Sequence, residues 1–283
     1  MRSPTGLWSD FFFCIFQFTL CTLHWSESVE LKGRVALVTG AATGIGRATV
    51  LRLARAGAAG IAINYRTAKE GAEKLAEEVR SIGAEALSVR ADVKSDKQVR
   101  EMMERTRQHF RRLDVLVNNA GVTHWVPLRD LEGLSDAIWD DVLDVNVKGA
   151  FRSIRAAAPL LSETQGMVVN VASISGVIAP STMSSLAYGT AKAALIYLTR
   201  ALAVALAPRV RVNAVAPAFT DTKWMRDHYG DNYAEVVSRA ASHIPLSRIA
   251  TPDDIAAAIV GLVAGGDFIT GQTLIVDGGL SLE

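Results

Sequence analysis

Seven short apolar runs alternate with helix-patterned segments from residue 31 to the end of the chain. The runs cover residues 34–40, 60–65, 86–93, 113–121, 166–173, 210–217 and 272–279. They are rich in Val, Ile and Ala, and several end in Gly, as buried parallel strands do. Helical spacing of apolar residues predicts helices over 47–56, 69–81 and 97–110. No internal repeat or linker interrupts this alternation. It therefore predicts one α/β domain, a doubly wound sheet of about seven parallel strands with helices on both faces.

Charge and cysteine content exclude several classes of protein. The 283 residues carry a formal net charge of +1, whereas a nucleic-acid binder would show a basic face or tail. The only cysteines are Cys14 and Cys21, which cannot form a disulfide framework or a cysteine-based zinc site. No His-rich or carboxylate cluster suggests a metal. The expected partner is a small molecule.

The first 30 residues differ from the rest in composition and in their pattern of apolar residues. An apolar run over 11–23 contains five of the nine Phe of the chain. It is shorter than the roughly 20 residues of a membrane span but has the length of a signal-peptide core. Asp10 abuts the run and Gln17 interrupts it. Two readings follow: a secretion signal or membrane anchor, or a disordered extension outside the fold. We expect the second, with a single domain over 31–283, a cytoplasmic location and no membrane contact.

A glycine-rich loop follows the first predicted strand and leads directly into a helix. Residues 39–46 read TGAATGIG, which gives the spacing Gly-x3-Gly-x-Gly for Gly40, Gly44 and Gly46. Glycines at such a turn let the backbone approach a pyrophosphate, and the helix N-terminus offers amide groups and partial positive charge to it. A turn alone would explain one glycine. Three at the first strand of an alternating pattern predict a dinucleotide site.

Several further motifs occur in a recognisable order. They are ADV (91–93), NNAG (118–121), VNVKG (145–149), Ser173 with Tyr188-x3-Lys192, and VDGG (276–279). With the glycine loop, they resemble the single-domain branch of the short-chain dehydrogenase/reductase family over nearly all of 31–283. The chain is similar to 3-oxoacyl-carrier-protein reductases and glucose-dehydrogenase-like members. The resemblance implies a Rossmann-type fold, a nicotinamide cofactor and a homodimer or homotetramer.

The end of the second predicted strand bears on which dinucleotide is used. A carboxylate there binds a ribose 2′-hydroxyl, whereas an Arg accepts a 2′-phosphate. This chain has Asn64-Tyr65-Arg66, with no carboxylate, and Arg66 can bind a phosphate through two hydrogen bonds. Thr43 is neutral where many NADP-preferring relatives are basic. We expect NADP(H) to be favoured, with NAD(H) possible.

The proposed catalytic set combines spacing with the resemblance. Tyr188 and Lys192 are four residues apart and share one helix face. A nearby ammonium should lower the pKa of the phenol from about 10, so that Tyr188 can act as acid and base. The resemblance implies that Ser173 binds the substrate oxygen, that Lys192 also holds the nicotinamide ribose, and that Asn146 positions a water linked to Lys192. Ser175 competes with Ser173, which is preferred because it directly follows a strand.

Other contacts follow from the resemblance. Cofactor contacts are assigned to Gly40, Thr43, Gly44, Ile45, Gly46, Tyr65, Arg66, Asp92, Val93, Asn119, Ala120, Gly121, Tyr188, Lys192, Pro217, Thr220 and Thr222. Substrate contacts are assigned to Ser173, Tyr188, Trp125 and Trp224. The interval from Ser173 to Tyr188 is about two residues longer than is common in the family, which predicts an enlarged loop over 178–186.

These residues favour an NADP(H)-dependent enzyme that transfers a hydride between nicotinamide and a carbonyl or secondary alcohol. The alternative is a non-catalytic dinucleotide-sensing or scaffold protein on the same fold. The intact Asn146, Ser173, Tyr188 and Lys192 speak against this alternative, because sensing needs no proton relay. An epimerase or dehydratase of the extended branch is disfavoured by the glycine spacing.

Overall fold

A single parallel sheet of seven strands organises the chain. The computed structural model describes residues 31–178 and 185–282. Its strands are β1 (Val35–Val38), β2 (Gly60–Tyr65), β3 (Glu85–Arg90), β4 (Val115–Asn118), β5 (Met167–Val171), β6 (Arg211–Pro217) and β7 (Thr273–Val276). They lie in the order β3-β2-β1-β4-β5-β6-β7, and every neighbouring pair is parallel. The predicted doubly wound sheet is confirmed, and each strand lies within one residue of its predicted run.

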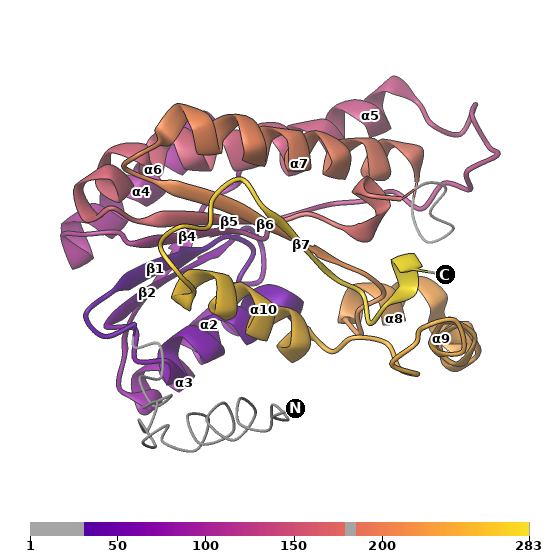
Figure 1. The fold of residues 1–283 in the computed structure, drawn as a ribbon, viewed down its shortest axis with the longest axis horizontal. Helices are drawn as coiled ribbons and strands as arrows, with labels where there is room; N and C mark the ends of the chain where they lie inside the picture. Colours follow the sequence, from indigo (N-terminus) through magenta and orange to yellow (C-terminus); the bar gives the residue numbers. More distant parts are fainter. Residues whose placement is uncertain (1–30, 179–184, 283) are drawn as a thin grey trace, which may run out of the picture.

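Helices cover both faces of this sheet (Figure 1). The principal ones are α2 (Gly44–Arg55), α3 (Lys69–Ile82), α4 (Asp96–Phe110), α6 (Ala150–Thr164), α7 (Leu186–Leu206) and α10 (Pro252–Ala264). Helices α2, α3 and α10 lie on one face, and α4, α6 and α7 on the other. Alternate residues of β1 supply the two cores: Ala36 and Val38 pack with the first group, and Val35 and Leu37 with the second. This alternation is the two-residue period of a strand buried on both faces.

The strand order reverses direction at β1, which pairs with β2 on one side and β4 on the other. In such sheets, ligands bind outside the carboxyl ends of the strands at this switch point. The shorter elements are α5 (Asp136–Leu143), a π-helix η1 (Asp144–Gly149), the 3₁₀ turns η2 (Ile174–Gly176), η3 (Gly230–Asn232) and η4 (Leu280–Leu282), α8 (Lys223–Tyr229) and α9 (Tyr233–Ala241). Helices α8 and α9 connect β6 to α10 beyond the carboxyl edge of the sheet (Figure 1).

Two expectations concern segments outside the described residues. They are the N-terminal extension over 1–30, with its two cysteines, and residues 179–184 of the enlarged loop. The described chain begins at Leu31, whose side chain is buried and whose amide donates to Ala56 O at 3.0 Å.

Among the described residues, one helix, α7, is long and apolar enough to cross a membrane. About 33% of its most apolar stretch is buried in the domain. Helix α7 packs along β6 and η2, and its buried residues include Ala191, Leu195 and Ala203. A core helix of a globular domain has the same length and composition.

Candidate active site

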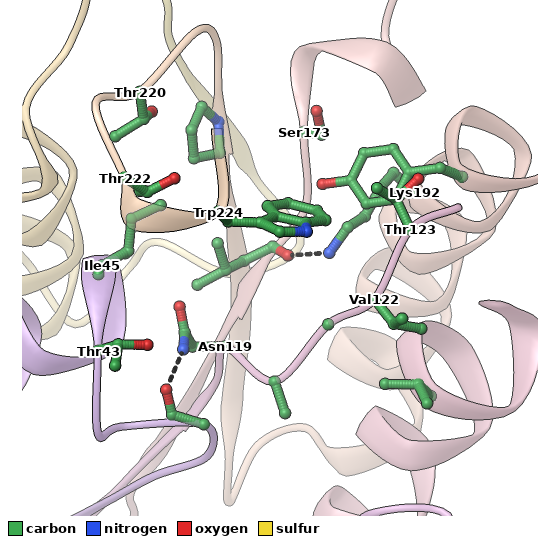
Figure 2. Close-up of a pocket in the computed structure, with 18 of the residues that line it drawn as sticks. Thr43, Ile45, Asn119, Val122, Thr123, Ser173, Lys192, Thr220, Thr222 and Trp224 are labelled. Carbon is green, nitrogen blue, oxygen red and sulfur yellow. Dashed lines mark hydrogen bonds between the residues drawn. The ribbon is translucent and has the colours of Figure 1, made fainter. Parts of the chain in front are cut away.

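A cleft with a volume of about 480 Å³ lies at the carboxyl edge of the sheet. Most of the residues expected at the site line it (Figure 2). They are Gly40, Thr43, Gly44, Ile45, Arg66, Asp92, Val93, Asn119, Ala120, Gly121, Trp125, Ser173, Tyr188, Lys192, Pro217, Thr220, Thr222 and Trp224. They come from the ends of the six strands β1 to β6 and the loops after them, and from the first turns of α2, α7 and α8. The cleft therefore lies at the switch point of the sheet.

Three expected residues lie behind the cleft wall instead. Tyr65 is buried among the core residues of α2 and α3, because alternate residues of β2 face that layer. Asn146 is buried on η1. Gly46 faces Asn119: a Cβ on Gly46 would lie 2.5 Å from Asn119 Nδ2 and 2.6 Å from Gly40 O. None of the three is among the residues that line the cleft, and the cofactor contacts expected of Tyr65 and Gly46 stay predictions.

The glycine loop and the α2 N-terminus fit an anionic group. Gly40 and Gly44 have φ of +60° and +55°, a backbone conformation that a side chain disfavours. Thr43 is the N-cap residue of α2, and its side chain makes no capping hydrogen bond. The first turn of α2 contains no acidic residue. The amide groups and the positive end of the helix dipole therefore point into the cleft, where a pyrophosphate is stabilised.

The loop is held in place from two neighbouring strands. Asn119 Nδ2 donates to Thr39 O and Gly40 O, each at 3.0 Å, and Asn64 Oδ1 accepts from Gly40 N at 3.2 Å. Asn64 Nδ2 also donates to Ala91 O at 3.1 Å, which ties the ends of β2 and β3 to the loop. Asn64 was not among the expected site residues. Its signal was an amide side chain within an otherwise apolar buried strand.

Ser173, Tyr188 and Lys192 meet at one side of the cleft because β5 and α7 approach closely. Ser173 lies two residues after β5, and Tyr188 lies in the first turn of α7, where Ser185 Oγ accepts from Tyr188 N at 3.4 Å. Gly176 allows this approach, since a Cβ there would lie 2.6 Å from Ala193 N. Ser173 lies close enough to the phenol to oppose the rise in the pKa of Tyr188 that burial causes. Both Ser173 and Ser175 line the cleft, and the preference for Ser173 stays a prediction.

The electrostatics of this pair differ from expectation. Burial raises the pKa of Tyr188 to about 12, with the Ser173 hydrogen bond opposing the rise, and burial lowers the pKa of Lys192 to about 8. The lysine Nζ lies 5.4 Å from the centre of the tyrosine ring and donates to Val171 O at 2.8 Å. The ammonium is thus directed at a backbone carbonyl and is itself destabilised by desolvation. The predicted lowering of the Tyr188 pKa is wrong for the protein without ligands.

The lowered Lys192 pKa predicts a pH-dependent stability. Between about pH 8 and the ordinary lysine pKa of 10.5, the folded chain releases a proton that the unfolded chain keeps. The free energy of unfolding should therefore rise with pH in this window, by up to about 1.4 kcal/mol per pH unit. Above about pH 10, the raised Tyr188 pKa acts in the opposite direction. We expect the free energy of unfolding, measured with urea from pH 7 to about pH 10, to rise more steeply with pH for the wild type than for Lys192→Met. Equal dependence on pH in the two proteins would contradict the account.

Asn146 faces Lys192 across Gly121. Asn146 Nδ2 donates to Val122 O at 2.8 Å and to Val142 O at 2.9 Å. Its Oδ1 is buried without a hydrogen-bond partner among the described residues. A Cβ on Gly121 would lie 2.8 Å from this oxygen and 3.6 Å from Lys192 Nζ. The unpartnered acceptor therefore points into the space beside the ammonium, as a water-positioning role requires. That role stays a prediction.

The opposite wall of the cleft is aromatic and comes from the loop after β4 and from α8. Trp125 follows β4, and Trp224 lies in the first turn of α8 (Figure 2). The Thr222 hydroxyl caps α8 by accepting from Met225 N at 3.4 Å. Thr222, an expected cofactor contact, therefore also stabilises the start of the helix that carries Trp224. Across residues 31–178 and 185–282, no group of three or more His, Cys, Asp or Glu is placed to hold a metal ion.

Comparisons with known proteins agree with this architecture. A family model described as enoyl-(acyl carrier protein) reductase matches residues 40–281. A 3-oxoacyl-(acyl-carrier-protein) reductase FabG of Staphylococcus aureus is 38% identical over 250 residues, which cover 87% of this chain and 97% of the relative. One from Thermotoga maritima is 36% identical over 257 residues, with coverages of 89% and 99%.

A solved structure of a gluconate 5-dehydrogenase from Burkholderia cenocepacia, in complex with NADP and tartrate, is also similar. It superimposes with a TM-score of 0.81 at 32% identity and covers 90% of this chain and 98% of its own. The family model spans most of the chain, and the relatives match it over nearly their whole length. The chain therefore belongs to the short-chain dehydrogenase/reductase family of NAD(P)-dependent oxidoreductases.

Proposed function

We propose that this protein is an NADP(H)-dependent carbonyl reductase or alcohol dehydrogenase in which Tyr188 is the acid and base. The observation that carries the proposal is the meeting of Ser173, Tyr188 and Lys192 in the cleft that the glycine loop also lines. A dinucleotide site accounts for the glycine loop, and proton transfer accounts for a half-buried phenol in the same cleft with Ser173 beside it and Lys192 one turn away.

The residues divide the chemistry among them. When bound, NADPH supplies the hydride that the carbonyl carbon gains. The Ser173 and Tyr188 hydroxyls polarise the carbonyl oxygen, and Tyr188 gives its proton to that oxygen as negative charge develops there. Lys192 lies beside the phenol and stabilises the phenolate that remains until a proton returns from solvent by way of Lys192 and Asn146. Alcohol oxidation runs through the same groups in reverse.

The fit of NADP(H) rests on the end of β2. Arg66 lines the cleft with an exposed side chain, and Arg90 Nε donates to Arg66 O at 3.3 Å, which holds the backbone that carries the Arg66 guanidinium. Relatives that include an NADP-bound structure support NADP(H) as the favoured cofactor. Use of NAD(H) as well remains compatible with the neutral Thr43.

Arg66→Ala tests this part of the proposal. Loss of the guanidinium should raise the KM for NADPH by about 10- to 100-fold, the cost of one to two charge-assisted hydrogen bonds to a phosphate. The KM for NADH should change less than about twofold, because NADH has no 2′-phosphate. Steady-state kinetics with both cofactors measure the difference. If the wild type used NADH as efficiently as NADPH, and if Arg66→Ala left the KM for NADPH unchanged, this site would not recognise the 2′-phosphate.

A panel of ketones and secondary alcohols, run with NADPH and NADH, tests the activity itself. We expect NADPH oxidation with at least one ketone. Tight NADPH binding without oxidation across the panel would favour the non-catalytic alternative.

We also propose that residues 31–283 form the catalytic domain, located in the cytoplasm. Leu31 is buried and its amide donates to Ala56 O, so residue 31 is already part of the fold. A chain starting at Leu31 should have a kcat within about twofold of that of the full chain and a Tm within about 3 °C of it. An inactive or insoluble product would assign residues 1–30 a role in folding or activity.

The exposed apolar side chains Phe151, Tyr197 and Val204 on α6 and α7 support the expected homodimer or homotetramer.

A further inference from the structure

Four aromatic side chains gather at one end of the cleft, and we call them the aromatic rim: Trp125, Trp224, His228 and Tyr229. Trp125 comes from the loop after β4 and the other three from α8, about a hundred residues later in the chain. The centre of the Trp125 ring lies 3.8 Å from that of His228, 5.6 Å from that of Trp224 and 6.1 Å from that of Tyr229. These distances are typical of attractive ring contacts.

Within this rim, Trp125 and Trp224 line the cleft, whereas His228 and Tyr229 do not. His228 stacks on Trp125 with an interplanar angle of 8°. It therefore covers one face of the indole from outside the cleft. On the other side of the same loop, His124 Nε2 lies 2.9 Å from Asp141 Oδ2, and Lys94 donates to Asp141 Oδ1 at 2.8 Å. The loop is held at two successive residues, so Trp125 faces the cleft in a fixed orientation. Its side chain therefore loses little conformational entropy when a ligand binds.

The rim reaches the proposed reaction centre. The Trp224 ring lies edge-on to the Tyr188 ring, with 6.0 Å between their centres, and Figure 2 shows Trp224 extending from the α8 side toward Lys192. A carbonyl compound whose oxygen reaches the Tyr188 hydroxyl must therefore place one of its substituents beside Trp224 and Trp125. Trp224 is 42% exposed, so its ring is available for that contact.

The charges next to the rim are neutralised within the protein. Lys223 Nζ lies 2.5 Å from Asp227, and Arg226 forms two hydrogen bonds with Asp221 at 2.6 and 2.7 Å. Both basic residues of α8 are thus already paired. Burial lowers the pKa of His228, which favours the uncharged imidazole. The rim consequently offers ring faces rather than an unpaired cation to whatever lies against it.

We propose that the aromatic rim selects flat, uncharged aromatic ketones, with Trp125 and Trp224 contacting the substrate ring and His228 positioning Trp125. This inference rests on the proposed function, because it concerns the same cleft. Aromatic pairs in offset or edge-on geometry are more stable than contacts of equal area with saturated groups. Two such contacts should give about tenfold discrimination for a planar ring.

Three ketones matched in size test the inference with NADPH and the full chain. Acetylnaphthalene carries a flat ring, acetyldecalin is its saturated counterpart, and acetylnaphthoic acid adds a carboxylate. We expect kcat/KM for acetylnaphthalene to exceed the other two values by about tenfold, mainly through KM. Conjugation makes an aryl ketone the less reactive one, so the preference cannot come from intrinsic reactivity. Equal or better use of acetyldecalin or of the acid would overturn the inference.

Variants assign the effect to the rim. Trp125→Leu should reduce the preference for acetylnaphthalene over acetyldecalin to below about threefold, while Phe268→Leu, at a fully exposed position outside the cleft, should leave it unchanged. His228→Ala should raise the KM for acetylnaphthalene, and His228→Phe, which keeps a stacking ring, should restore it. An unchanged preference in Trp125→Leu would overturn the assignment. Failure of the proposed function looks different, since then no ketone of the three would oxidise NADPH.

Discussion

Tyr188→Phe should lower NADPH-dependent ketone turnover by about 10³-fold, because it removes the hydroxyl that we propose gives its proton to the carbonyl oxygen. The substitution deletes one oxygen and keeps the ring against Trp224, so the wall of the cleft stays intact. The loss should appear in kcat, since proton donation acts in the transition state. NADPH affinity, measured by quenching of protein fluorescence, should change by less than about threefold.

Tyr197→Phe is the matched control. Tyr197 lies on the same helix, α7, but its side chain is 73% exposed and outside the cleft. Removing its hydroxyl should leave kcat and KM unchanged. Turnover by Tyr188→Phe at the wild-type rate would mean that another group supplies the proton and would remove Tyr188 from the proposed chemistry.

Gly46→Ala should abolish measurable NADPH binding and destabilise the fold by about 2 to 3 kcal/mol. A Cβ at this position would lie 2.6 Å from Gly40 O and 2.9 Å from Ala41 Cα, both backbone atoms that cannot move independently of the loop. It would also displace the Asn119 amide that holds Thr39 O and Gly40 O. Overpacking of this kind costs about 1 to 3 kcal/mol, and the lost hydrogen bonds add to it. Urea unfolding and NADPH titration measure the two effects.

Gly71→Ala provides the comparison. Gly71 lies in α3 near the same loop, but a Cβ there would meet Ala42 O at 3.5 Å, an ordinary contact. Alanine is the better helix former, so this variant should be as stable as the wild type or more stable by up to about 1 kcal/mol, with NADPH binding retained. If Gly46→Ala bound NADPH normally, the close approach of the loop to Asn119 would not be needed for the cofactor site.

Sequence patterns predicted the strands well, because a strand buried on both faces must be almost continuously apolar. Residues 60–65 form β2 with the predicted bounds. The position of Ser173 beside Tyr188 was also accessible, since a strand end and a helix start at one edge of a parallel sheet converge. Fixed spacing within the motifs carried most of this information.

Contacts that depend on which way a side chain turns were not accessible. The sequence places Tyr65 next to Arg66, but the strand period sends Tyr65 into the core and leaves Arg66 exposed. Lys192 lies one turn from Tyr188, yet its Nζ donates to Val171 O, which belongs to a strand 21 residues earlier. Such a bond depends on packing between β5 and α7. The stacking of His228 on Trp125 likewise joins helix α8 to the loop after β4, and no local pattern encodes their meeting.

The central claim is that this cleft transfers a hydride to a carbonyl carbon. The most direct measurement uses NADPH deuterated at the reactive carbon of the nicotinamide, the full chain and the ketone panel, with mass spectrometry of the products. We predict a secondary alcohol that carries one deuterium on the former carbonyl carbon, formed by the wild type and not by Tyr188→Phe. Tight NADPH binding by the wild type without any deuterated alcohol would contradict the claim.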